Sequence, residues 1–116
     1  MQIEVKGRNW SVTEDLRERV EKRFAKVGRQ VSPLARLEVE LREERNPAIA
    51  DSHVAEATLY LKGVTLRASD ASPDMLRSLN QCADDLGRQV KRHRDKRRNR
   101  RGARAPGLDE GASPAA

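Results

Sequence analysis

Cysteine, aromatic residues and long apolar runs are all scarce in this chain of 116 residues. The single cysteine, Cys82, excludes a disulfide or a cysteine-rich metal site within one chain. Only Trp10, Phe24 and Tyr60 are aromatic, which argues against a surface that stacks several bases on aromatic rings. The charged N-terminus is unlike a signal peptide, and no apolar run reaches the length of a membrane span. We therefore expect a cytoplasmic protein with no membrane partner.

Charge is abundant but unevenly placed. The chain has 24 Lys and Arg against 18 Asp and Glu, a net charge of +6. Ten of those basic residues and one acid, Asp95, lie between Gly87 and Arg104, so the remainder has 14 basic and 17 acidic residues. Such a local excess is typical of a surface that binds the phosphates of a nucleic acid. A solubilising tail is the alternative, and a membrane-surface helix is disfavoured because the segment has no Trp or Phe anchor.

Alternation of apolar and polar residues predicts four strands, at residues 1–5, 36–45, 53–62 and 64–68. Helical spacing of apolar residues predicts a first helix over 14–29, capped by Thr13 and ended by Ser32-Pro33. A second helix is predicted after Ser72 as N-cap, with Pro73 at the first helical position. Its apolar stripe runs from Met75 to Val90, and we expect fraying before Gly102.

This element order, β-α-β-β-β-α, predicts an α+β fold. One four-stranded sheet with two helices packed on one face buries the apolar stripes of both helices. We expect a single domain over residues 1–97. Residues 98–116 are first basic and then rich in Gly, Ala and Pro, which predicts a disordered tail.

Basic residues gather on one side of each predicted helix, away from the apolar stripe. On the first helix they recur at helical spacing and are segregated from the acids, although a solvated face with mixed ion pairs is the plain alternative. The predicted RNA-binding residues are Arg19, Lys22, Arg23, Lys26, Arg88, Lys91, Arg92, Arg94 and Lys96.

Catalytic chemistry has little support in the sequence. His53 and His93 lie in different predicted elements, and neither has a metal-type companion three or four residues away. Asp84 and Asp85 suggest a metal-dependent nuclease, but adjacent helical positions diverge too far to share one ion easily, so surface charge is the preferred interpretation. Cys82 lies on the apolar stripe and is expected to be an inert core thiol. We predict no enzyme activity, no catalytic residue, no metal, no cofactor and no small-molecule substrate.

Two segments resemble the ribosome hibernation-promoting factors, also called ribosome-associated translation inhibitors. The opening MQIEVKGRNWSVTEDLRERVEKRFAKV is similar to the family's first strand and helix, including Gly7, Asn9, Thr13 and residues 23–26. The segment ASDASPDMLRSLNQCADDLGRQVKRHRDK is similar to its last strand end and second helix. The resemblance covers about residues 1–97 and matches the short form of the family or an isolated N-terminal module.

The resemblance implies a fold similar to a double-stranded-RNA-binding domain with an added first strand. It implies a bacterial protein of the stress response and stationary phase, a monomer away from the ribosome, that binds the small ribosomal subunit and its ribosomal RNA. There it would occupy the messenger and transfer RNA channel, inhibit translation and promote hibernation. The family's basic positions correspond to Arg23, Lys26, Arg88, Arg92, Arg94 and Lys96.

The sequence departs from the family at three positions. Asp85 stands where a Lys is usual, Leu76 where a Tyr is usual, and Asn80 where an Asp is usual. The first change removes a phosphate contact, and the other two put the contacts of those side chains in doubt. The residues alone also fit a general double-stranded nucleic-acid-binding protein without ribosome specificity.

Overall fold

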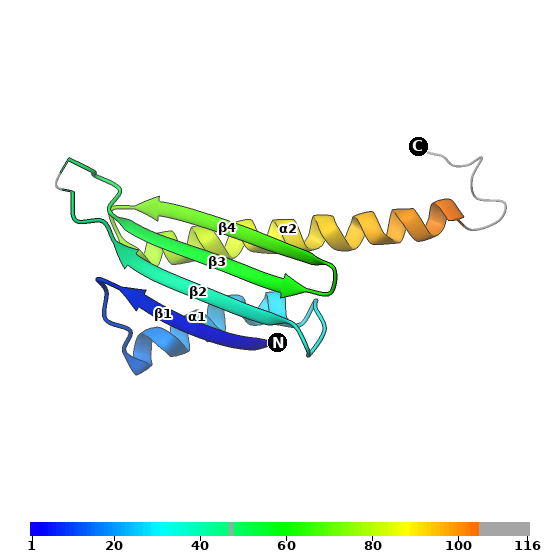
Figure 1. Cartoon of the computed structure of the whole chain (residues 1–116), viewed down its shortest axis with the longest axis horizontal. Helices are drawn as coiled ribbons and strands as arrows, with labels where there is room; N and C mark the ends of the chain where they lie inside the picture. The colour runs from blue at the N-terminus through cyan, green and yellow to red at the C-terminus, as the bar shows by residue number, and fades with distance from the viewer. Residues whose placement is uncertain (47, 105–116) are drawn as a thin grey trace.

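The computed structural model describes the backbone of residues 1–46 and 48–104, and the side chains of these residues up to Arg97. The element order is β1 (Gln2–Arg8), α1 (Glu14–Gly28), β2 (Arg36–Glu43), β3 (His53–Leu61), β4 (Val64–Ser72) and α2 (Met75–Arg104) (Figure 1). The predicted order of strands and helices is therefore confirmed. Within the described part of the chain, no helix is both long and apolar enough to cross a membrane.

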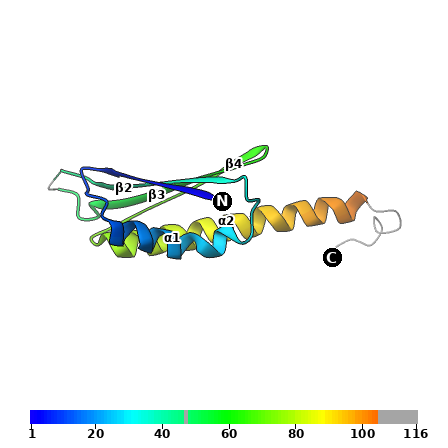
Figure 2. The same cartoon turned by 90° about the horizontal axis from the view of Figure 1, so that it is seen from below.

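The four strands form one mixed sheet in the spatial order β1-β2-β3-β4. β1 pairs with β2 in parallel, and the other two pairs are antiparallel. A parallel pair needs a crossover connection, and α1 supplies it. Gly63, with φ of +81°, makes the tight turn between β3 and β4. Both helices cover the same face of the sheet, as predicted, and run side by side in the same direction (Figure 2).

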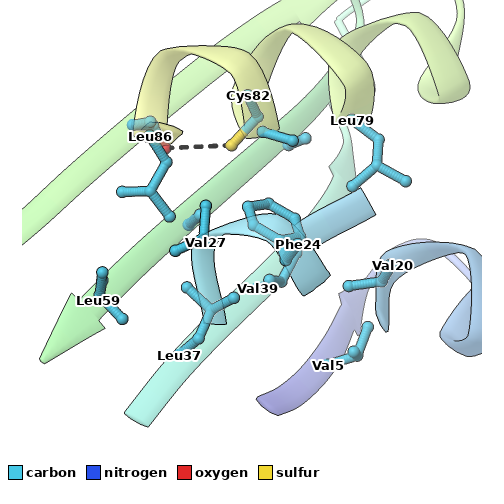
Figure 3. Close-up of a cluster of buried hydrophobic side chains, with 14 of the residues drawn as sticks. Val5, Val20, Phe24, Val27, Leu37, Val39, Leu59, Leu79, Cys82 and Leu86 are labelled. Carbon is cyan, nitrogen blue, oxygen red and sulfur yellow. Dashed lines mark hydrogen bonds between the residues drawn. The ribbon is translucent and has the colours of Figure 1, made fainter. Parts of the chain in front are cut away.

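The core lies between this covered face and the helices (Figure 3). Alternate residues of the strands point into it, and Leu37, Leu59 and Phe24 are completely buried there. Met1, which precedes β1, and Ile3 within it are half-buried and pack against the cluster. The period-two and helical patterns therefore identified the correct faces, because burial of one face is what fixes strand register and helix rotation.

The start of α2 differs from the prediction. Asp74, not Ser72, caps the helix: its carbonyl accepts from Ser78 N at 3.0 Å and its Oδ2 accepts from Arg77 N at 3.1 Å. Ser72 instead pairs with His53 as the last residue of β4, and its hydroxyl lies 2.6 Å from that of Ser78. The strand pairing continues further than the local capping pattern could show, so it shifts the helix start by two residues.

Element ends also differ from the predictions. β2 ends at Glu43 and β3 at Leu61, slightly earlier than expected, whereas α2 continues to Arg104 and passes the predicted fraying point before Gly102. Arg and Lys are good helix formers, and adding turns to a formed helix is far easier than nucleating one. Residues 105–116 of the predicted tail lie outside the described residues.

Candidate nucleic-acid interface

The buried stripe of α1 fixes which side of the helix faces solvent. Thr13 caps the helix by accepting from Leu16 N at 3.2 Å, as predicted. Val20, Phe24 and Val27 are buried against the sheet and α2. The four basic residues predicted on this helix are therefore all exposed, namely Arg19, Lys22, Arg23 and Lys26.

The α2 helix is held in the same way by Leu79, Cys82, Leu86 and Val90, which are buried. Because this stripe faces the sheet, the basic residues of the helix are directed away from it. Four of the five predicted basic residues on α2 are exposed and Arg94 is half-buried; the exposed ones are Arg88, Lys91, Arg92 and Lys96.

A groove of about 720 Å³ runs between the two helices. Six of the nine predicted residues line it, three from each helix, together with Arg29, which the prediction left out. These seven basic residues face one acid, Asp84. They are Lys22, Arg23, Lys26, Arg29, Arg88, Lys91 and Arg94. We call this hollow the basic groove.

Three predicted residues lie outside the basic groove. Arg19 lines an adjoining hollow of about 520 Å³ nearer the helix starts, where Asp15 and Glu18 also lie. Arg92 and Lys96 line no groove between the helices. Their helical positions place them on the same flank of α2 as Gln89, whose side chain donates to the Arg67 carbonyl of β4. The positive face therefore has two parts, a hollow between the helices and a flank beside β4.

Two of the nine predicted cations are already paired within the chain. Arg23 lies 3.7 Å from Asp84, and Arg88 contacts Asp85, one turn earlier on α2. The other seven form no ion pair with the described residues. Their charge is therefore available to a polyanion, which would release condensed counterions from its phosphates on binding.

Asp85 lies beside a second carboxylate, that of Asp70, and the sequence pattern did not reveal this neighbour. Asp70 of β4 points to the covered face, and one of its carboxylate oxygens is buried without a hydrogen-bond partner in the described structure. Burial, followed by the neighbouring Asp85 carboxyl, raises the pKa of Asp70 to about 6. The pair lies next to the basic groove, because Asp85 contacts Arg88, which lines that groove.

Two of the remaining candidates for chemistry, Cys82 and His53, pack against other parts of the fold. Burial raises the pKa of Cys82 to about 12, so the thiol is neutral, and its sulfur lies 3.5 Å from the Ala68 carbonyl. This agrees with the inert core thiol that was predicted. Trp10, which directly precedes the loop into the first helix, packs edge-on against the ring of His53, with the ring centroids 5.1 Å apart. Among the described residues, no three His, Cys, Asp or Glu side chains are grouped to hold a metal ion.

Residues 3–98 match the family described as Sigma 54 modulation protein / S30EA ribosomal protein. The ribosome hibernation promoting factor of Salmonella typhimurium is 34% identical over 96 residues, which cover 83% of this chain and 96% of that protein. The Escherichia coli factor of the same name is 33% identical with the same coverage. The Picosynechococcus ribosome hibernation promotion factor is 30% identical over 97 residues, and this chain spans 50% of its length.

Solved structures show the same relationship as these sequence comparisons. The Thermus thermophilus Protein Y N-terminal domain superposes with a TM-score of 0.68 at 29% identity, over 80% of this chain and 99% of that one. A ribosomal subunit interface protein from Coxiella burnetii gives a TM-score of 0.67 at 19% identity over 82% and 99%, which shows a shared fold. The resemblance seen in the sequence is confirmed. By its sequence, and with the same fold, the chain belongs to the Sigma 54 modulation protein / S30EA ribosomal protein family.

Proposed function

We propose that this chain binds the small ribosomal subunit through its ribosomal RNA and inhibits translation by occupying the messenger and transfer RNA channel. The observation that carries the proposal is the basic groove, in which seven basic residues from the two helices and the end of α1 face one acid. The relatives named as ribosome hibernation promoting factors make the ribosome the favoured polyanion. The site of action would then be the bacterial cytoplasm.

The mechanism requires no reaction and no cofactor. Lys and Arg side chains in the groove would contact phosphates, and the helices that hold them are fixed by the buried stripe beneath. Binding in the channel would exclude messenger and transfer RNA by occupying their space. The silenced ribosome would remain intact and could be used again when the protein leaves.

A charge-reversal experiment tests the groove. The variant K22E/K26E/K91E changes three exposed groove lysines, and K6E/R8E/R67E makes the same change in net charge on the uncovered face of the sheet. We expect the groove variant to lose about a hundredfold or more in affinity for the small subunit in sedimentation at physiological salt. The sheet variant should bind nearly as well as the parent. Equal losses in the two variants would show that net charge, not the groove, governs binding.

Three further measurements test the specificity for the ribosome, the position in the channel and the phosphate contacts of the groove. If the affinity for a random RNA duplex equals that for the small subunit, the chain is instead a general double-stranded nucleic-acid-binding protein without ribosome specificity. Ribosomes preloaded with messenger and transfer RNA should exclude the protein, and undiminished binding to them would place the site elsewhere. Neutral substitutions of single groove lysines should each reduce the log–log salt slope by about one unit.

A further inference from the structure

A separate hollow of about 330 Å³ lies at the far end of α1, between the segment that follows this helix, the end of β3 and α2. Its floor is apolar. Val31 and Leu61 are half-buried, and Val90 is 2% exposed. The volume is at the lower end of the range for small-ligand sites, about 300–1,000 Å³. An apolar floor of this size suits one flat group rather than a peptide or a lipid chain.

The rim of this hollow is polar and positive. Lys62 directly follows β3, and His93, Arg94 and Arg97 lie within a stretch of five residues on α2. No acidic side chain of the described residues lines the hollow. A ligand with an apolar, planar body and a negative group would complement both the floor and the rim.

Arg94 joins this hollow to the basic groove, because its side chain lines both. Its Nε is buried and has no hydrogen-bond partner among the described residues. Burial of a guanidinium nitrogen without a partner is unfavourable, and an anion held by the outer guanidinium nitrogens would offset that cost electrostatically. A strand whose phosphates follow the groove would therefore reach the hollow at Arg94.

We propose that this hollow receives one unpaired nucleotide of the bound RNA, with its base on Val31, Leu61 and Val90 and its phosphate on Arg94 and Arg97. This inference rests on the proposed function, since it requires RNA in the basic groove. Unpaired bases are the parts of an RNA that can leave the stack and enter a protein pocket, where apolar side chains and guanidinium planes cover their faces. The hollow would thus add shape selectivity to a groove that reads only phosphates.

The test fills the hollow without touching the groove. V31W places an indole over the floor, and L34W places the same indole three residues away at a side chain that is 94% exposed and outside the hollow. The probes are an RNA hairpin with a single bulged adenosine and the same hairpin without the bulge. We expect the parent and L34W to prefer the bulged hairpin by about tenfold, the size of one base contact. V31W should bind both hairpins equally, with the parent's affinity for the unbulged one.

The outcomes separate the two proposals. If the parent binds both hairpins equally, or V31W keeps the preference, the nucleotide site is overturned while ribosome binding stands. A parent protein that does not co-sediment with the small subunit would instead overturn the proposed function. Adenosine monophosphate alone should bind at least a hundredfold more weakly than the bulged hairpin, and equal affinity would contradict a nucleotide of bound RNA as the occupant. Thermal unfolding of both variants checks that each is folded, and V31L, which keeps an aliphatic side chain in the floor, should retain the preference if V31W does not fold.

Discussion

The two faces of this molecule are both rich in charge, yet they use it differently. On the uncovered face of the sheet, Arg42 donates to Glu40 at 3.1 Å, to Glu44 at 3.3 Å and to Glu56 at 3.3 Å. Next to this cluster, the guanidinium of Arg36 stacks on the ring of Tyr60, whose hydroxyl donates to Glu38. On the helix face, seven of the nine predicted cations have no acidic partner among the described residues.

The comparison shows that the two faces differ less in charge density than in how many of their cations have an acidic partner, and it is this difference that favours the helix face as the proposed binding surface. Arg42 illustrates the paired state. Burial acts to lower its pKa, but the hydrogen bonds to Glu44 and Glu40 and the charge of Glu56 outweigh this and raise it. A cation held in this way stabilises the fold, whereas the lysines of the basic groove have no acidic partner among the described residues and would gain partners from a bound polyanion.

Among the single substitutions that test this comparison, the largest effect is expected from breaking the paired cluster on the sheet. R42M removes the common partner of three carboxylates and should lower the free energy of unfolding by about 1–2 kcal/mol at neutral pH, measured by urea denaturation. R67M is the matched control, because Arg67 is exposed on the same face and has no ion pair in the described structure. RNA affinity of folded R42M should match the parent. An equally large loss of stability in R67M would show that the ion pairs of Arg42 do not contribute more to stability than an unpaired arginine on the same face.

A smaller effect is expected at the carboxylate pair between the two faces. The folded-state pKa of Asp70, about 6, exceeds its ordinary value of 3.8, so the folded protein binds the extra proton and stability falls as pH rises from about 4 to about 6. Asp85, Arg88 and the neutral Cys82 are the titratable groups around it. D70N should remove this slope and stabilise the protein by about 1 kcal/mol at pH 7 after allowance for solvent screening. Urea titrations from pH 4 to 8 measure it, and an unchanged slope in D70N would exclude Asp70 as the source.

The smallest effect should come from releasing a paired cation on the helix face. D85N frees Arg88 and removes one negative charge beside the basic surface, so RNA affinity should rise about two- to fivefold and the log–log salt slope should steepen by about one unit. D51N makes the same charge change at an exposed loop position away from the groove. Binding isotherms at several salt concentrations give the RNA affinity and the salt slope of D85N and of D51N. If D51N raises affinity as much as D85N does, the gain is a general effect of net charge.

Much of the fold follows from local pattern, because burial imposes a period on each element. The alternation of Leu37, Val39 and Leu41 and the helical spacing of Val20, Phe24 and Val27 are such signals. The cap of α2 was misplaced because the pairing of Ser72 with His53 is a contact across the sheet, and no neighbouring residue reports it. The helical spacing predicted which nine basic residues lie on the exposed sides of the helices. It could not predict that six of them line the basic groove and three lie outside it.

What the sequence could not supply is the position of one helix beside the other. Arg29 and Arg94 both line the basic groove although they are 65 residues apart in the sequence. Asp70 lies near Asp85 because α2 packs along β4. The proposed nucleotide hollow is likewise formed by three segments that are far apart in the sequence, namely residues 30–32, 61–62 and 90–97. Contacts of this kind depend on helix packing, which the periodicity of a single element does not determine.

The length of α2 has a consequence for its local stability. Val90 is the last buried residue of this helix among those described, yet the helix continues to Arg104 and projects beyond the sheet (Figures 1 and 2). An isolated helix of that length would be marginal in water, since the first turn is the costly one to form. Here the packed half of α2 acts as the nucleus. The projecting half is therefore a helix that grows outward from the core, and its amide hydrogens should exchange progressively faster toward its end.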